Sequence, residues 1–163
     1  MNIVIEQAGA KDAETISAIL QEAARWLIEN DRKLWDLNQF SVESIREQIK
    51  DEMFWLAKIN GESAGCVRFQ LSDEEYWGDV PNADADSAFI HRLAVRRKYA
   101  GQGISKALID WAKTRASAES REFLRLDCAD RESLRRVYEN YGFEFHSFKE
   151  REPYKVARYQ FKI

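Results

Sequence analysis

The chain has 163 residues, of which 45% are apolar and 12% aromatic, and its formal net charge is −3 at pH 7. This length fits one domain, the aromatic content argues against disorder, and the slightly acidic balance shows no general nucleic-acid footprint. No apolar run approaches the roughly 20 residues that a membrane span needs, so no membrane partner is expected.

The N-terminal sequence, the histidines and the cysteines further limit the class of protein to which this chain can belong. The N-terminus, MNIVIEQAGAKDAE, lacks a basic region followed by an apolar stretch, which argues against a signal peptide. Only two histidines occur, and the two cysteines, Cys66 and Cys128, each stand inside an apolar run. We therefore expect buried, reduced thiols, no metal site, and a cytoplasmic enzyme or binding protein.

The first half of the chain alternates between strand-like and helical patterns. In chain order, the patterns predict a strand at residues 3–5, a helix after Asp12, a linker at 26–40, a helix from Ser41, and strands at 53–59 and 64–71. Asn60-Gly61 separates the last two strands and favours the positive φ angles of a tight hairpin turn. The acidic stretch 72–86 is interpreted as a loop, with Tyr76 and Trp77 available to contact a ligand.

The second half interleaves strands and helices in the same way. In chain order, we predict a strand at residues 88–95, a glycine turn, an amphipathic helix from Ile104, a strand at 123–126, a short helix at 134–141 and strands at 143–148 and 154–161. Gly142 stands in the usual position of a helix stop. No repeat or linker interrupts the chain, so a single mixed α/β domain spanning residues 1–163 is predicted.

The stretch RKYAGQGIS, residues 97–105, places two glycines between a strand and a helix. The first amides of a helix have no partner within it, and the helix dipole adds partial positive charge, so such a turn can hold a phosphate. Gly101 and Gly103 would let an anion approach closely because no Cβ blocks the way. Three basic residues raise the positive potential just before the glycines: Arg96, Arg97 and Lys98.

Two common phosphate-binding motifs do not match this turn. A Walker loop needs Lys and Ser or Thr after its second glycine, whereas Gly103 is followed by Ile104 and Ser105. The dinucleotide fingerprint needs a third glycine where Lys106 stands. From these residues alone, the turn remains open between a phosphate site and an ordinary strand-to-helix connection.

Two separated motifs stand in order around this turn. The first runs from Leu93-Ala94-Val95 through the basic residues and glycines to the helix that carries Trp111; the second comprises Arg125-Leu126-Asp127 and the stretch from Leu134 to Phe143. Together they resemble the GCN5-related N-acetyltransferase (GNAT) family, whose acetyl-CoA motif is Gln/Arg-x-x-Gly-x-Gly/Ala. Lys98 takes the Gln/Arg position and keeps the positive charge, while Ala100 stands where an arginine is common.

The resemblance implies an α/β (α+β) fold with a mixed, mostly antiparallel sheet of about seven strands and about four flanking helices. It also implies acetyl-CoA as co-substrate, bound through strand backbone groups and the amides of the glycine turn. The implied cofactor-binding residues are Leu93, Ala94, Val95, Lys98, Gly101, Gln102, Gly103, Ile104, Ser105 and Arg131. Arg131 is the nearest equivalent of an asparagine that contacts coenzyme A in many relatives.

The reaction that the resemblance implies is direct attack of a neutral amine on the thioester carbonyl. Tyr138 matches the family tyrosine that protonates the leaving thiolate, although a core aromatic on its helix would look the same. The base stays open: His91 alternates with Phe89 and Leu93 on one strand face, and Asp86 begins that strand. Two further carboxylates are candidates: Glu75 and Asp127.

The acceptor is the least determined part of this interpretation. Trp26 and Trp35 lie between the first two helices, where the family often builds its acceptor site, and Trp77 could join them; simple packing is the alternative. The implied function is an N-acetyltransferase acting on a small-molecule or peptide amine, and the alternative is a non-catalytic acyl-CoA-binding regulatory module. The closing strands could pair in a homodimer, but no residue pattern decides this.

Overall fold

The structure, a computed structural model, describes residues 1–163. The chain divides into two compact units, one formed by residues 1–68 with 92–108 and the other by residues 69–91 with 109–163. Neither unit is a continuous stretch of the chain, so the sequence offers no linker between them. The single domain therefore stays a prediction from the sequence.

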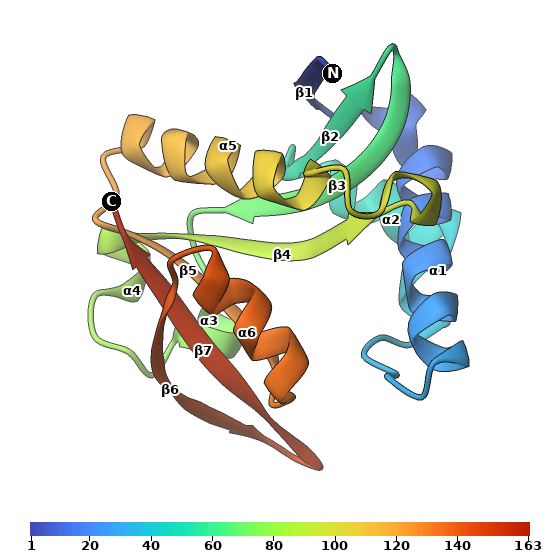
Figure 1. The fold of residues 1–163 in the computed structure, drawn as a ribbon. Helices are drawn as coiled ribbons and strands as arrows, with labels where there is room; N and C mark the ends of the chain where they lie inside the picture. Colours follow the sequence, from blue (N-terminus) through green and yellow to red (C-terminus); the bar gives the residue numbers. More distant parts are fainter. The chain divides into compact units, whose positions relative to one another are not determined.

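Seven strands and six α-helices make up the fold (Figure 1). They are β1 (Ile3–Gln7), α1 (Ala13–Glu29), α2 (Val42–Ile49), β2 (Phe54–Ile59), β3 (Glu62–Gln70), α3 (Glu74–Trp77), α4 (Ala83–Asp86), β4 (Ser87–Val95), α5 (Ile104–Ala118), β5 (Phe123–Ala129), α6 (Glu132–Asn140), β6 (Glu144–Arg151) and β7 (Tyr154–Lys162). The strand order is β1-β2-β3-β4-β5-β7-β6. The β4–β5 pair is parallel, whereas β1–β2, β2–β3, β5–β7 and β6–β7 are antiparallel. The predicted mixed, mostly antiparallel sheet is confirmed.

In the first unit, α1 and α2 pack against the strands through one apolar core. The helical spacing of Ile16, Ile19 and Leu20 puts all three on the buried side of α1, where each is fully buried. They join Ile45 of α2 and Phe54 of β2 in a common cluster. Because these side chains leave water together, the two helices and the strands stabilise one another.

The other side of β3 receives the first turn of α5. A Cβ atom on Gly65 would lie 2.7 Å from the carbonyl oxygen of Ala94 and 3.1 Å from Cγ2 of Ile104, so only glycine permits this approach. The next residue, Cys66, points into the core of α1 and α2, as expected from the alternation of side chains along a strand. Gly65 therefore lets the start of α5, and with it the glycine turn, lie directly against the strands.

Several local predictions are confirmed at the residues that motivated them. Asn60 and Gly61 have φ angles of 50° and 80° and connect β2 to β3, and Gly142 follows α6 with φ 89°. The hydroxyl of Ser41 accepts a hydrogen bond from the amide of Ser44 (3.2 Å) and caps α2. In contrast, the predicted linker at 26–40 is wrong in its first residues, because α1 continues to Glu29.

In the second unit, residues 72–86 form two helical turns rather than the expected loop. The carboxylate of Asp73 accepts a hydrogen bond from the amide of Tyr76 (3.0 Å) and so caps α3. Trp77 at the end of α3 is fully buried against Phe89 of β4 and Ala83 of α4. This apolar anchor explains why an acidic stretch becomes ordered, and it raises the helix number from the expected four to six.

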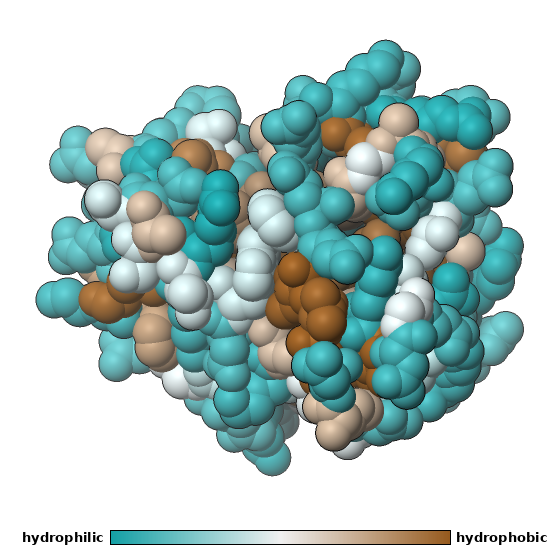
Figure 2. Space-filling model, turned by 90° about the horizontal axis from the view of Figure 1, so that it is seen from above, coloured by the Kyte–Doolittle hydropathy of each residue, from teal (hydrophilic) through white to brown (hydrophobic).

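Hydrophilic side chains cover most of the molecular face in Figure 2, and hydrophobic side chains show there in small patches. No helix combines the length and the apolar character that crossing a membrane requires. Cys66 and Cys128 are both buried free thiols, as predicted. Burial raises the pKa of each thiol to about 12, so both stay protonated at neutral pH.

Candidate active site

The glycine turn of the first unit has the backbone geometry of an open anion cradle. Gly101 and Gly103 lie in the left-handed region, with φ 77° and 81°, and no atom lies within 4 Å of where a Cβ would stand on either. Helix α5 begins directly after them, at Ile104. The amide of Gln102 donates to the carbonyl of Tyr99 (3.3 Å), so this predicted phosphate donor already has a partner. The turn thus presents helix-start amides beside unobstructed space.

The basic residues before the turn are held by neighbours within the same unit. Lys98 pairs with Glu62, and the ion pair raises the pKa of the lysine. The guanidinium of Arg97 lies 4.0 Å above the ring of Trp26. Arg96 donates to the carbonyl of Ser63 (3.0 Å). These contacts fix the cations near the turn, although Lys98 would have to leave its carboxylate partner to contact a phosphate.

Strand β4 carries an irregularity that the sequence did not predict. Arg92 has φ 56°, a left-handed conformation that is rare for a residue with a side chain and typical of bulges. The expected alternation of His91 with Leu93 therefore does not continue through Arg92. The side chain of Arg92 lies over the ring of Phe40, with 4.9 Å between the guanidinium carbon and the ring centre.

In the second unit, His91 lies between two carboxylates. Its Nε2 is 2.8 Å from Oδ2 of Asp73, and its Nδ1 is 3.5 Å from Oδ1 of Asp127. The side chains are 18%, 3% and 11% exposed, respectively, so water can still reach the ring but hardly reaches the acids. Burial is the largest cause that raises the pKa of Asp127 to about 6. This arrangement can hold and release a proton near neutral pH.

The other predicted bases have structural partners. Asp86 ends α4, where its Oδ1 accepts from the hydroxyl of Ser87 (2.5 Å) and lies 3.2 Å from Arg125. Glu75 is exposed and forms an ion pair with Arg151. Of the base candidates, only His91 and Asp127 lie next to each other.

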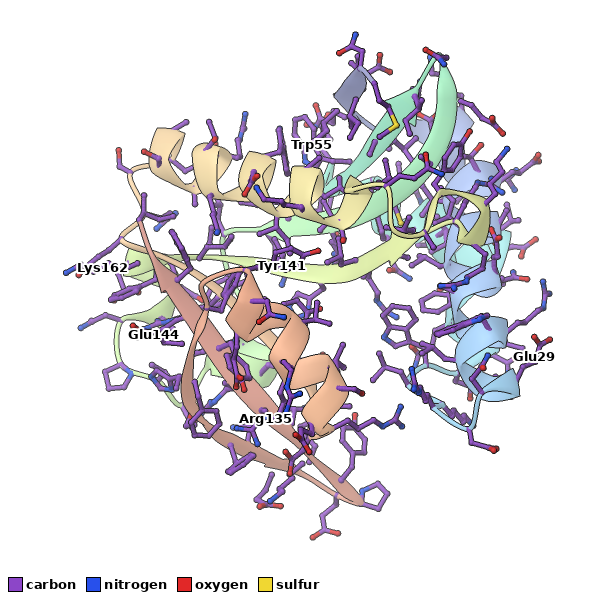
Figure 3. The ribbon with its side chains drawn as sticks, in the orientation of Figure 1. Glu29, Trp55, Arg135, Tyr141, Glu144 and Lys162 are labelled. Atoms are coloured by element: carbon purple, nitrogen blue, oxygen red, sulfur yellow. The ribbon has the colours of Figure 1, made fainter.

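Tyr138 lies on α6, which contacts β5 and β6 in the second unit. Desolvation raises the pKa of its phenol, so the hydroxyl keeps its proton at neutral pH. Arg135 on the same helix donates to the hydroxyl of Tyr159 in β7 (2.8 Å), and that hydroxyl donates to Glu139 (2.7 Å). Figure 3 shows Arg135 within α6 and Tyr141 directly after the helix. The helix is therefore anchored on both sides of Tyr138.

The predicted acceptor residues differ in how accessible they are. Trp26 is partly buried under Arg97, and Trp35 packs edge-on against Phe40 with 5.5 Å between ring centres. Trp77 is fully buried, so it has no surface on which to contact a ligand. Arg131 is partly buried at the N-cap position of α6.

Sequence reasoning missed Asp73, whose carboxylate holds both His91 and the start of α3. An acidic residue before a short helix is a capping signal, which could have identified the local role. Its contact with His91 depends on how α3 packs beside β4, and no sequence pattern reports that.

Comparisons with known proteins match this chain to acetyltransferases. The sequence profile described as the acetyltransferase (GNAT) family matches residues 16–143. The uncharacterized N-acetyltransferase YesJ of Bacillus subtilis (strain 168) is 32% identical over 142 residues, covering 83% of this chain and 78% of that protein.

Solved structures have the same fold. A GNAT-family acetyltransferase from Listeria monocytogenes 4b F2365 is similar with a TM-score of 0.82 and 28% identity, over 99% of this chain and 95% of that one. The acetyltransferase yncA from Salmonella typhimurium, solved with its cofactor acetyl-CoA, has a TM-score of 0.73 and 13% identity, over 99% and 94% of the two chains. At that identity, the second likeness concerns the fold alone.

Proposed function

The chain belongs to the acetyltransferase (GNAT) family, and on this premise we propose that it transfers the acetyl group of acetyl-CoA to the amine of a small molecule or peptide. The observation that carries the proposal is the pair of left-handed glycines directly before α5. Their open Cβ positions lie beside the amides at the start of the helix, and a bound diphosphate would need both that space and those amides.

In this proposal, the amides of Gly101, Gly103, Ile104 and Ser105 bind the pyrophosphate of acetyl-CoA. They carry partial positive charge at the start of a helix of 15 residues, which favours a bound anion. Lys98 adds charge once the phosphate competes with Glu62 for its ammonium group. The side chains of Arg96, Arg97 and Lys98 serve mainly to attract the anion, because they already have partners within the protein.

The pantetheine arm is proposed to pair with backbone groups of Leu93, Ala94 and Val95. The left-handed Arg92 supports this, since such a conformation departs from regular strand geometry just before these residues. A backbone N–H near Leu93 or Ala94 would stabilise the oxyanion that develops on the thioester carbonyl.

The proton transfers belong to His91 and Tyr138. An alkyl amine is mostly protonated at neutral pH, and its ammonium form must first give one proton to His91. The free amine then attacks the thioester carbonyl, the C–N bond forms and the C–S bond breaks. Tyr138 gives its proton to the departing thiolate, and the phenolate recovers a proton from the attacking nitrogen, which carries positive charge until it loses that proton. The net products are the acetylated amine, coenzyme A and one proton.

A screen of amines with acetyl-CoA tests the proposal. Primary amines, polyamines, amino acids and peptides are incubated with the protein, and both the free thiol and the acetylated product are measured. We expect thiol release that depends on the amine, with one acetyl group gained per thiol released. Tight acetyl-CoA binding without transfer to any amine would instead favour the non-catalytic binding module.

A further inference from the structure

The contacts around His91 favour one tautomer of its ring. Asp73 accepts the amide N–H of Tyr76 on Oδ1 (3.0 Å), and its Oδ2 lies 2.8 Å from Nε2 of His91. Oδ1 is thus an acceptor, and an ionised Asp73 would accept at Oδ2 as well, with Nε2 of His91 as the donor. Nε2 must then carry hydrogen, and in the neutral ring the lone pair remains on Nδ1.

That lone pair faces another acceptor. Oδ1 of Asp127 lies 3.5 Å from Nδ1, is buried from solvent and has no hydrogen-bond partner. A buried carboxylate oxygen without a donor costs free energy, and so does a lone pair directed at it. One proton placed between the two atoms would relieve both costs, because either atom could then donate to the other.

We propose that Oδ1 of Asp127 and Nδ1 of His91 form a shared proton site, which takes the proton released by the acceptor ammonium group. The transfer breaks one N–H bond of the ammonium, whose electron pair stays on nitrogen, and places the proton on Nδ1 beside Asp127. Asp73 is the positioning residue that fixes the ring through Nε2. This inference rests on the proposed function, since it names the group that activates the amine.

The charges around Asp127 support this assignment. The groups that face this site from the surrounding elements are Asp73, Glu75, Tyr76, His91, Tyr138 and Arg151. Burial and the negative charges of Asp73 and Glu75 raise the pKa of Asp127, while His91 and Arg151 act in the opposite direction. A proton bound by the pair lowers the local negative charge, as expected for a group that accepts protons near neutral pH.

The same side chains are less suited to a metal ion. The ligand atoms of Asp73, His91 and Asp127 all lie within 4.8 Å of one another. However, the 2.8 Å hydrogen bond occupies one ring nitrogen and one oxygen of Asp73, so a cation would have to replace it. We therefore assign the cluster to proton transfer, and include zinc and EDTA in the test.

Only His91 and His146 occur in the chain, so His146→Gln leaves a single histidine for NMR. We expect the ¹⁵N signals at pH 8 to show a proton on Nε2 and none on Nδ1. The ¹³C signal of the Asp127 carboxyl should change as the pH falls through about 6, and the ¹⁵N signal of Nδ1 should change in the same transition. Two separate transitions, or a proton on Nδ1 at pH 8, would overturn the shared site.

Kinetics with an active amine then test the role of the pair. Asp127→Asn should lower kcat about 10- to 100-fold, shift the acid limb of the pH profile to lower pH and leave acetyl-CoA binding within twofold. Asp127→Glu should recover part of kcat, and Asp73→Asn should change the ring tautomer seen by NMR. An unchanged pH profile in Asp127→Asn, or activity that zinc restores after EDTA, would refute the proton role.

The two proposals fail in different ways. If no amine is acetylated while the NMR transition is shared, the proton site exists but its role toward an amine is refuted together with the proposed function. If acetylation occurs while the two groups titrate separately, the proposed function stands and the shared site is wrong.

Discussion

At Tyr138, the proposed role as a proton donor can be distinguished clearly from a role in packing. Its phenol keeps its proton at neutral pH because desolvation raises its pKa, so it can donate but not accept there. Replacement by Phe removes only the hydroxyl and leaves the ring to pack against Phe143.

We expect Tyr138→Phe to lower kcat by roughly 10²-fold or more while the Kd for acetyl-CoA changes less than twofold. Steady-state kinetics and calorimetry measure the two quantities. Tyr141→Phe, three residues further along, is the matched control and should keep near-normal kcat. Equal loss in both variants would assign Tyr138 to packing.

The buried carboxylate of Asp127, proposed to serve catalysis, is expected to lower the stability of the protein at neutral pH. Its pKa rises from 3.8 to about 6 on folding, so the folded state binds this proton more tightly than the unfolded state. Its contribution to stability is therefore lost as the pH rises from about 4 to about 6. Asp127→Asn should raise the thermal midpoint at pH 7.5 and have little effect at pH 4. A lower midpoint at pH 7.5 would contradict the unpaired, buried state of the carboxylate.

At the scale of elements, the turn before α5 has an internal control in the β2–β3 hairpin. Gly103 and Gly61 have nearly the same φ, 81° and 80°, and open space at the Cβ position in both cases. Replacing either by Ala should cost about 1 kcal/mol of stability, since both are left-handed. Only Gly103→Ala places a methyl group where the pyrophosphate is proposed to lie.

We therefore expect Gly103→Ala to weaken acetyl-CoA binding about 10-fold or more, and Gly61→Ala to leave it unchanged. Calorimetry gives the affinities, and thermal unfolding shows that both variants lose similar stability. Equal affinity in the two variants would mean that Gly103 serves only the turn.

The elements that could be predicted from the sequence are those whose signals are local. Asn60-Gly61 specifies its turn through backbone preference, and Gly142 ends α6 for the same reason. The helical turns within residues 72–86 could not be predicted, because they depend on burial of Trp77 against Phe89. The left-handed Arg92 has no local signal either, since arginine, unlike Gly or Asn, does not favour that conformation.

The same limit holds for the candidate site. The glycine turn lies within nine residues of sequence and was predicted with its open backbone, whereas the role of its residues toward acetyl-CoA stays a prediction. His91 and Asp127 were only two of four base candidates, because their contact depends on the pairing of β4 with β5. Asp73 was missed altogether, since α3 was expected to be a loop.

For the molecule as a whole, one buried arginine makes part of the stability depend on pH in the acid range. Arg158 is 4% exposed, and its hydrogen bond is the main cause that lowers the pKa of Asp79 from 3.8 to about 2. The folded state binds this proton less tightly than the unfolded state, so the stabilisation is present above about pH 4 and lost as the pH falls toward 2.

Asp79→Asn should therefore lower the thermal midpoint at pH 7, with the difference from the unmodified protein disappearing near pH 2. Glu47→Gln, which breaks the exposed pair with Lys50, is the control and should change the midpoint little at either pH. A constant effect of Asp79→Asn across this range would show that the carboxylate charge does not matter.

Calorimetric titration with acetyl-CoA and ATP is the decisive test of whether this chain binds acetyl-CoA through the turn before α5. We expect micromolar binding of acetyl-CoA, no comparable binding of ATP, and a loss of affinity in Gly103→Ala but not in Gly61→Ala. Absence of acetyl-CoA binding, or equal affinity for ATP, would contradict this binding mode.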